Sequence, residues 1–537
     1  MLLQSIVTLV LVAAAAAVPA IEPRAISTVV EVEAGFLKGK LSADQTIVSY
    51  LGIPYAAPPV GNLRFRPPQP AAAFKGTYDA TKMGNSCMQG PAPQFYGGVN
   101  QNNSEDCLNL NIFAPAKAIV AGDYSTLPVI VYLYGGGFND GYNNLPLYDG
   151  AALLKAMPAG EQAIVVVPNY RTNIFGFATS NELLAEGSVN AGILDQKAVF
   201  EWVRKNIANF GGDPNKVTAW GESAGAITIA THMVSGDVTK PLFDRAILQS
   251  GGLFAFGNIP PITQGGFDSL VAAVGCSGKT PVLDCLRKVP AQKLFDSAAA
   301  AGVSYLPAVD GKYVKQQPQV ALSKGQIYKI PAILLDNTNE GTFFTTSVQT
   351  ADDVTNLFKG FGFFNADAVA QLQKLYPVSS FASPFLAGAE FYGDLVFKCP
   401  ERLLAKTLTA AGQSVFKGRF NVKPTVTLPA GGSFFSLLGV FHSAEMPFVW
   451  SFQQTINQSN GEKAFSQNMI SSWNDFAFGK TPGSSVGISW PTFGTTSTRI
   501  VWQLTNNGAV ETLDATFNAR CDFLDAASLA FSTSINA

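Results

Sequence analysis

One serine stands in a setting that suits nucleophilic chemistry. The run 217–226 reads as an apolar strand, a Gly-x-Ser-x-Gly turn centred on Ser223, and a helix of small residues. Where a strand reverses this sharply into a helix, side chains beside the serine would clash, so both flanking positions require glycine. The hydroxyl is then exposed at the carboxyl end of the strand. The pattern predicts a nucleophile elbow with Ser223 as the nucleophile.

The bare motif is weak evidence, because roughly 0.3 chance matches are expected in a chain of this length and glycine content. A second copy at 483–487 illustrates the point. It follows Lys-Thr-Pro and precedes Ile-Ser-Trp-Pro, so neither a strand nor a helix adjoins it. We interpret the second copy as a surface loop and Ser223 as the reactive serine.

A serine hydroxyl needs a base, and the chain contains two histidines, His232 and His442. His232 follows on the helix that leaves the turn, and a rise of 1.5 Å per residue carries it about 13 Å from Ser223 along the axis. His442 lies in a loop after a late strand, so it is predicted to be the base and His232 a structural histidine. Because the base acts in its neutral form, turnover should fall in acid with an apparent pKa of roughly 6–7.

The base in turn needs a carboxylate on its other ring nitrogen. Asp336 and Glu340 both follow a predicted strand at 332–335, and position alone does not separate them. A developing oxyanion needs preorganised N–H donors. The glycine run 135–137, which follows another predicted strand, and the N–H of Ala224 at a helix start can supply such donors.

The elements that would hold these residues alternate between strand and helix. Residues 28–66 read as a turn-rich antiparallel start, 191–210 as an amphipathic helix ended by glycine and proline, and 350–412 as helical cover. The alternation predicts an α/β fold with a large, mostly parallel sheet and functional residues at the carboxyl ends of its strands. Predicted strands lie at 129–133, 164–167, 217–222, 246–248, 332–335, 414–420 and 499–503.

Composition sets further limits on the chain of 537 residues. It is 47% hydrophobic and 14% charged, enough for a large buried core and too little charge for a disordered or nucleic-acid-binding protein. The net charge of −2 gives no field that attracts a polyanion. No linker-like shift in composition divides residues 21–537, so we predict a single domain there. No later segment has the apolar length for stable membrane insertion.

Several features point to export and an extracellular location. Residues 1–20 read as a signal peptide, with a short apolar core that ends in small residues. Six cysteines in an exported chain suggest three disulfides, whose connectivity the sequence does not determine. Pairing neighbours along the chain would close two short loops. Asn102 and Asn457 begin N-glycosylation sequons.

Together these motifs resemble the type-B carboxylesterase/lipase family, which includes fungal lipases, liver-type carboxylesterases and cholinesterases. The resemblance covers nearly the whole mature chain. It implies an α/β-hydrolase fold with helices on both faces of the sheet, and hydrolysis of small apolar carboxylic esters without a metal or cofactor. The landmarks are Tyr50–Gly61, Glu105–Ile112, the glycines at 135–137, Asn169–Arg171, Phe210–Pro214, Gly221–Gly225, Asn339–Gly341 and the loop around His442.

The resemblance also implies roles for individual residues. It implies Glu340 rather than Asp336 as the acid of a Ser223–His442–Glu340 triad. It implies that Glu222, beside the serine, helps to stabilise the charged histidine. The oxyanion donors would be Gly136, Gly137 and Ala224, the pocket-lining residues Phe343 and Phe344, and the disulfides Cys87–Cys107, Cys276–Cys285 and Cys399–Cys521.

The chain departs from the family pattern at Tyr134, where many members have histidine, and at Ala219 and Asn109. The loop between Cys87 and Cys107 is short and glycine-rich, with no amphipathic helix to act as a lipid-opened lid. Two alternatives stay open. The abundant phenylalanines allow a long pocket, as in a true triacylglycerol lipase or sterol esterase. More remotely, the chain could be a non-catalytic binding protein on the same fold.

Overall fold

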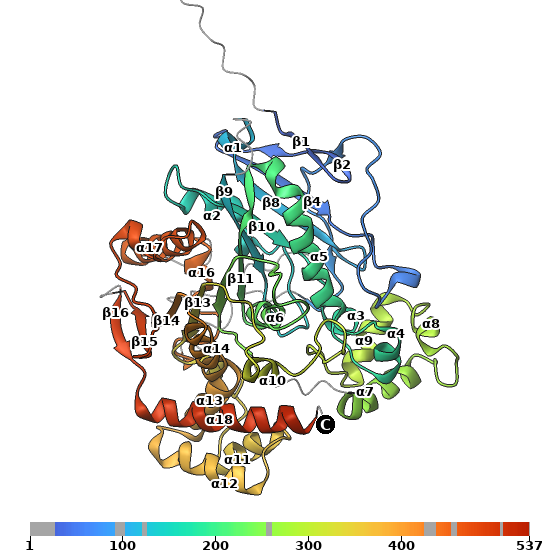
Figure 1. Cartoon of the computed structure of the whole chain (residues 1–537). Coiled ribbons are helices and arrows are strands. Elements are labelled where there is room, and N and C mark those ends of the chain that lie inside the picture. Colours follow the sequence, from blue (N-terminus) through green and yellow to red (C-terminus); the bar gives the residue numbers. More distant parts are fainter. Residues whose placement is uncertain are drawn as a thin grey trace, which may run out of the picture.

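A computed structural model of the chain describes residues 27–91, 102–120, 126–253, 260–423, 437–452, 459–504 and 508–535. The predicted signal peptide, Asn457 and the middle of the loop between Cys87 and Cys107 lie outside these ranges. The described chain folds around an eleven-stranded sheet (Figure 1). In spatial order its strands are β16 (Ala509–Thr512), β15 (Thr498–Trp502), β14 (Val415–Phe420), β13 (Ala332–Asn337), β12 (Arg245–Gln249), β11 (Gly212–Glu222), β9 (Leu127–Leu133), β10 (Ile164–Pro168), β8 (Asn109–Pro115), β4 (Ile47–Pro54) and β3 (Lys40–Leu41).

The centre of the sheet is parallel and its two edges are antiparallel. Every neighbouring pair from β10 to β15 is parallel, whereas β16 at one edge and β8, β4 and β3 at the other pair antiparallel. Strand β9 shows why the sequence reads as a continuous apolar run. Val129 and Val131 pack into the core on one face, and Ile130 and Tyr132 pack into the core on the other. The predicted α/β class is confirmed.

Helices cover both faces of the sheet. The predicted helix at 191–210 ends at Asn206 and continues as a 3₁₀ turn over Ile207–Phe210, since helices often tighten in this way at their last turn. The helices from the start of the chain to the middle are α1 (Ala116–Val120), α2 (Gly150–Ala156), α3 (Asn173–Gly176), α4 (Asn181–Glu186), α5 (Ala191–Asn206), α6 (Ala224–Met233), α7 (Pro260–Ala273), α8 (Val282–Leu286), α9 (Ala291–Ala300) and α10 (Pro318–Ser323).

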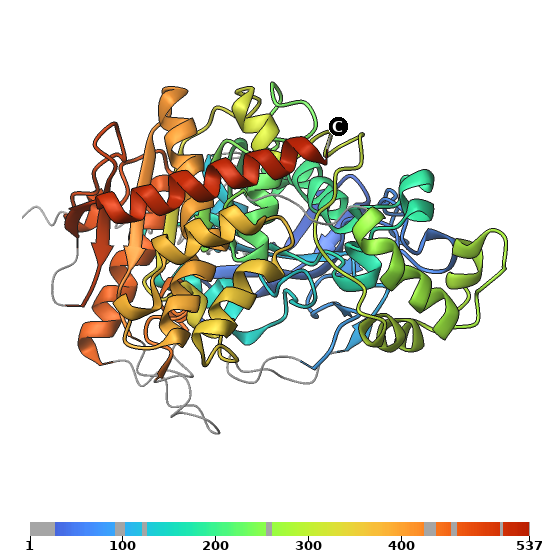
Figure 2. The ribbon, with the colours of Figure 1, turned by 90° about the horizontal axis from the view of Figure 1, so that it is seen from below.

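The region predicted as helical cover, 350–412, is helical, and a π-helical turn at Asp394–Lys398 interrupts it. The long C-terminal helix α18 (red) crosses the front of these helices in Figure 2. Within the described part of the chain, no helix combines the length and apolar character needed to span a bilayer. The later helices are α11 (Ala351–Gly360), α12 (Ala366–Leu375), α13 (Pro384–Gly393), α14 (Cys399–Ala410), α16 (Met446–Val449), α17 (Asn460–Ala477) and α18 (Ala515–Ser534).

The remaining strands and the disulfides tie the periphery to this frame. A small sheet joins β1 (Val29–Val32), β2 (Gly35–Lys38) and β5 (Tyr78–Asp79), and β6 (Ser86–Cys87) pairs with β7 (Asn103–Ser104). Three disulfides join the six cysteines in the pairs that the family resemblance implies: Cys87–Cys107, Cys276–Cys285 and Cys399–Cys521. The last of these connects α14 with α18, more than a hundred residues further along the chain.

Candidate active site

Ser223 lies at the tight turn between β11 and α6, with φ +54° and ψ −125°. Non-glycine residues rarely adopt this conformation, so surrounding contacts must hold it. The Ser223 N–H donates to the carbonyl of Gln249 at 2.8 Å. A Cβ at Gly225 would lie 2.1 Å from the carbonyl oxygen of Leu133, and one at Gly221 would lie 2.7 Å from the carbonyl carbon of Gly225. Both flanking glycines are therefore required by close packing.

The three glycines after β9 lie next to this turn. A Cβ at Gly135 would lie 3.0 Å from the Cβ of Ser223. Gly137 and Ala224 line the same pocket as Ser223, and Gly136 precedes Gly137 with φ +102°. The N–H of Ala224 belongs to the first turn of α6, where backbone donors have no partner within the helix. Gly137 and Ala224 thus adjoin Ser223 in the pocket, and the role of Gly136, Gly137 and Ala224 as oxyanion donors stays a prediction.

Tyr134, the residue before the glycine segment 135–137, forms a closed pair with Tyr170. The two rings stack with centroids 4.3 Å apart. The hydroxyl of Tyr134 donates to the carbonyl of Tyr170 at 2.8 Å, and the hydroxyl of Tyr170 donates to the carbonyl of Tyr134 at 2.6 Å. The pair fixes the start of the glycine segment against the chain that follows β10.

Two distant loops are clamped together to form the other half of the site. The N–H of Asn339 donates to the carbonyl of Val440 at 2.9 Å, and the side-chain oxygen of Asn339 accepts from the N–H of Val440 at 3.0 Å. A Cβ at Gly439 would lie 2.4 Å from that same oxygen, so the approach depends on glycine. Glu340 directly follows Asn339, and His442 lies two residues after Val440. The clamp therefore brings the side chains of Glu340 and His442 face to face.

Glu340 is oriented by hydrogen bonds at both oxygens. Its Oε2 lies 2.7 Å from Nδ1 of His442. Its Oε1 accepts from the hydroxyl of Ser250 at 2.7 Å and from the N–H of Asn337 at 2.6 Å. A carboxylate held in this way can fix the tautomer of the imidazole and stabilise its charged form.

The other nitrogen of the imidazole lies near the carboxylate of Glu222. Nε2 of His442 is buried, makes no hydrogen bond to any described residue, and lies 3.4 Å from Oε1 of Glu222. Glu222 directly precedes Ser223 and also accepts from the hydroxyl of Ser443 at 2.5 Å. Nε2 therefore lies beside the residue that precedes Ser223, and it makes no hydrogen bond to Ser223 in this structure. Such catalytic hydrogen bonds are often loose until substrate binds.

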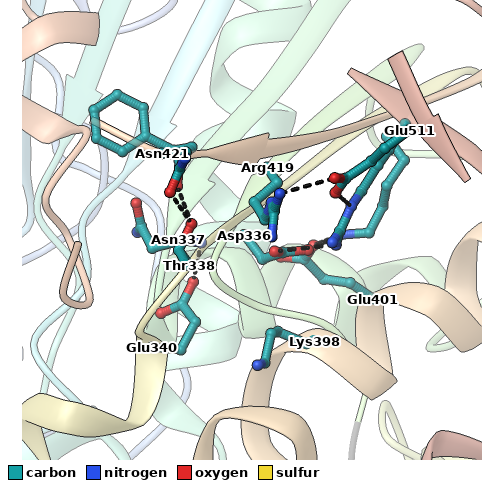
Figure 3. A network of polar contacts seen from close by, with 12 residues as sticks. Asp336, Asn337, Thr338, Glu340, Lys398, Glu401, Arg419, Asn421 and Glu511 are labelled. Carbon is teal, nitrogen blue, oxygen red and sulfur yellow. Dashed lines mark hydrogen bonds and ion pairs between the residues drawn. The ribbon is translucent and has the colours of Figure 1, made fainter. Parts of the chain in front are cut away.

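Asp336 has different partners from Glu340. The predicted strand at 332–335 extends to Asn337, so Asp336 lies within β13 and Glu340 follows it. Asp336 is fully buried and ion-paired with Lys417, and Nη1 of Arg499 lies 3.6 Å from it. Lys417 also pairs with Glu401 at 2.5 Å. In Figure 3 the side chains of Asp336 and Glu340 lie among separate groups of residues. The charge of Asp336 is balanced by cations, so the geometry favours Glu340 as the acid.

The carboxylates around His442 change its protonation. Burial alone would lower the pKa of this imidazole, but its hydrogen bond to Glu340 and the charges of Glu222, Glu340 and Glu445 outweigh burial and raise the pKa to about 9. The apparent pKa of roughly 6–7 expected from the sequence assumed an unperturbed imidazole. The structure indicates a higher pKa for His442, because three acidic groups lie near the ring.

Ser250, Asn337 and Glu445 are site residues that sequence reasoning missed. Glu445 accepts from the side-chain amide of Asn337 at 2.6 Å and from that of Gln249 at 2.9 Å. Burial and the nearby charge of Glu222 raise the pKa of Glu445 to about 8. Ser250 directly follows β12, so the rule that functional residues follow strand ends could have indicated it.

His232 is fully buried and makes its contacts with residues outside this site. Its Nδ1 lies 2.6 Å from the hydroxyl of Tyr313, and its Nε2 lies 3.1 Å from Oε1 of Gln196. Burial lowers the pKa of His232 to about 3. Both ring nitrogens are occupied by neutral partners, as the structural role predicted from the sequence requires.

A pocket of about 690 Å³ opens beside Ser223. Phe344 lines it, stacks on Tyr392 at 4.9 Å and contacts the ring of His442 at 5.1 Å. Phe343 meets Phe344 edge-on at 5.4 Å but is not part of the lining. Phe397, which the sequence did not single out, stacks on His442 at 4.4 Å and lines the pocket. The site therefore combines a polar corner with an aromatic wall.

The other predicted site residues fall outside this centre. The sequon residue Asn102 is exposed beside β7. In the described ranges no group of three or more histidine, cysteine, aspartate or glutamate side chains is placed to hold a metal ion.

The strand order and the strand–turn–helix at Ser223 define an α/β-hydrolase esterase, and comparison with known proteins agrees. The model of the carboxylesterase family matches residues 26–524. Secreted lipase 1 of Botryotinia fuckeliana is 33% identical over 485 residues, which cover 78% of this chain and 83% of that protein. Cholinesterase of Mus musculus is 31% identical over 494 residues, which cover 84% of this chain and 78% of that protein.

A solved structure gives the same result. EstA of Aspergillus niger superposes with a TM-score of 0.82 at 26% identity, covering 93% of this chain and 98% of EstA. The chain belongs to the carboxylesterase family and is a serine carboxylic ester hydrolase.

Proposed function

We propose that this protein is a secreted esterase that hydrolyses apolar carboxylic esters through Ser223, His442 and Glu340. The observation that carries the proposal is the setting of His442. Glu340 holds one ring nitrogen at 2.7 Å, and the other nitrogen lies 3.4 Å from Glu222, the residue before Ser223, which itself lines an apolar pocket. This is the arrangement that a general base needs in order to activate a serine.

In the acylation step, Oγ of Ser223 attacks the ester carbonyl carbon and Nε2 of His442 takes the hydroxyl proton. The carbonyl oxygen becomes an oxyanion, which the N–H groups of Gly136, Gly137 and Ala224 stabilise. The bond between the carbonyl carbon and the alcohol oxygen then breaks. His442 gives its proton to the leaving alcohol, and the acyl group stays on the serine.

Deacylation repeats these steps with water. Nε2 of His442 takes a proton from the attacking water, and the same N–H groups hold the second oxyanion. The bond between the acyl carbon and Oγ of Ser223 breaks, and the serine recovers its proton. Glu340 stabilises the imidazolium in both halves, and Glu222, 3.4 Å from Nε2, adds a second negative field.

Export is supported by three disulfides, which form in oxidising compartments, by the apolar leader, and by the name of the Botryotinia relative. A second candidate function is hydrolysis of long-chain triacylglycerols or sterol esters. The aromatic pocket lining favours it. Rates on butanoate and on emulsified long-chain esters, measured across the solubility limit, separate a soluble-ester hydrolase from a lipase that needs an interface.

The test of the proposal is labelling with a fluorophosphonate probe, with Ser485→Ala as the matched control because Ser485 is central in the second Gly-x-Ser-x-Gly copy. We expect Ser223→Ala to lose labelling and to lower kcat by about 10⁴-fold or more. Ser485→Ala should keep both. Labelling that persists in Ser223→Ala, or ester hydrolysis near the wild-type rate, contradicts the assignment.

A further inference from the structure

The pocket beside Ser223 extends to the C-terminal helix. Ser528 and Phe531 of α18 line it together with Phe363, which follows α11. None of the described residues that line it carries a charge. An apolar chain would leave no buried charge unpaired there, whereas a charged ligand would find no partner. The residues that line it are Gly137, Phe138, Ser223, Ala224, Ile227, Ile262, Leu306, Phe344, Gly360, Phe361, Gly362, Phe363, Tyr392, Leu395, Val396, Phe397, Ser528 and Phe531.

A series of ring contacts links the imidazole to α18. Phe344 contacts His442 and stacks on Tyr392, as described above. Tyr392 contacts Phe361 at 5.9 Å, and Phe361 contacts Phe363 at 6.2 Å. Phe363 in turn packs on Phe531 with centroids 5.0 Å apart. Phe531 is thus the last ring of an aromatic wall that begins at the catalytic corner.

Helix α18 is held in place by covalent and ionic contacts. The disulfide Cys399–Cys521 joins it to α14. The buried guanidinium of Arg402 on α14 pairs with Asp522 at 2.6 Å and with Asp525 at 3.3 Å. Directly after Phe531, the buried hydroxyl of Ser532 hydrogen-bonds Oε1 of Gln319 at 3.3 Å. A ring on a helix fixed in this way is a firm boundary, because the backbone that carries it cannot yield to a longer ligand.

We propose that Phe531, packed on Phe363, forms the end wall of the substrate pocket and sets the length of the apolar chain that the enzyme accepts. The inference rests on the proposed function of the site. The chain can belong to the acyl group or to the alcohol, since both are apolar in such esters. Shortening the end wall should admit about two further methylene groups, which corresponds to roughly a tenfold gain for longer chains.

The experiment measures kcat/KM for two soluble series. One series varies the acyl chain of p-nitrophenyl esters from acetate to decanoate, and the other varies the alcohol of acetate esters over the same range. Phe531→Ala should raise the ratio of long-chain to short-chain kcat/KM about tenfold in one of the series, and Phe531→Trp should lower that ratio. The series that responds identifies the half of the ester that occupies the pocket.

Leu529→Ala is the matched control. Leu529 lies on the same helix, is 37% exposed and does not line the pocket, so its removal should leave the ratio unchanged. Ratios that stay at the wild-type value in both Phe531 variants, in both series, overturn the inference while leaving the esterase assignment intact. Absence of hydrolysis of every ester by the wild-type protein would instead contradict the proposed function. Because the two substitutions change the ring in opposite directions, a general loss of stability cannot produce the expected pair of results.

Discussion

The two histidines of this protein occupy equally buried regions with opposite electrostatics. Around His232, helix α6 meets Gln196 and Tyr313, whose side chains are neutral, and burial lowers the pKa of the imidazole to about 3. Around His442, the loop after β14 meets Glu340, Glu222 and Glu445, and their influence exceeds that of burial and raises its pKa to about 9. Burial disfavours the charged ring in both regions, so the neighbours decide the direction.

The two regions also differ in the hydrogen bonding of the ring nitrogens. Both nitrogens of His232 have a partner, whereas Nε2 of His442 has no hydrogen bond among the residues that the structure describes. A histidine with both nitrogens hydrogen-bonded contributes to packing and stability, and a histidine with one nitrogen outside any hydrogen bond can move a proton. This contrast leads to measurable differences.

The largest difference concerns turnover. His442→Gln should lower kcat by about 10⁴-fold or more, because the base and the later acid are lost together. His232→Gln should keep kcat within a few-fold of wild type and lower the free energy of unfolding by about 1–3 kcal/mol, because a buried hydrogen-bonded group is removed. Steady-state kinetics and urea unfolding check both. A loss of turnover in His232→Gln comparable to that of the other variant would undo the comparison.

The two acids near the end of β13, Asp336 and Glu340, extend the comparison. Glu340→Gln should lower kcat by about 10²–10⁴-fold, since the amide no longer stabilises the imidazolium. Asp336→Asn should act on stability, because it leaves the buried cation of Lys417 with a single buried carboxylate partner in Glu401. The expected cost is about 3–5 kcal/mol of unfolding free energy. If Asp336→Asn impaired kcat more than Glu340→Gln, the assignment of the acid would be wrong.

The pH dependence tests the difference in charge. Because the base must be neutral and the pKa of His442 is raised to about 9, kcat/KM should increase with pH from neutral into the alkaline range. Glu222→Gln removes a charge that raises this pKa, so the midpoint should move down by about 1 unit or more. A midpoint that stays in place in Glu222→Gln contradicts the role of that carboxylate.

The two histidines should change the free energy of unfolding with pH in opposite directions. The raised pKa of His442 contributes stability that is complete below the unfolded-state value near 6.5 and is lost as pH rises through about 9. The lowered pKa of His232 contributes stability above about 6.5 that declines as pH falls toward 3. Unfolding measured across this range in His232→Gln should show a weaker loss in acid than wild type.

The smallest expected effect is on the hydrogen bonds of His232. Tyr313→Phe removes the hydroxyl that lies 2.6 Å from Nδ1 and should cost about 1–3 kcal/mol of stability, with kcat unchanged. Thermal unfolding and steady-state kinetics measure the two quantities. A fall in kcat beyond a few-fold would show that the region around His232 influences the site.

The features that the sequence determined are local. The turn of Ser223 depends on two nearby glycines and on the strand and helix that adjoin it. All of these lie within ten residues, so the sequence alone predicts the turn. With two histidines in the chain, helix geometry alone set His232 apart from the serine. Apolar runs likewise located the buried strands, because both faces of the parallel sheet are covered.

Only the tertiary structure determined the features that depend on contacts between distant segments. Asp336 lies near the end of β13 and Glu340 follows that strand, and they are distinguished by Lys417, 81 residues after Asp336, and by His442, 102 residues after Glu340. The upward shift of the pKa of His442 owes much to Glu222 and Glu340, which come from other segments of the chain. Phe531 reaches the pocket because α18 packs across helices from the middle of the chain. Electrostatic and packing energies depend on distances in space, which residue order does not encode directly.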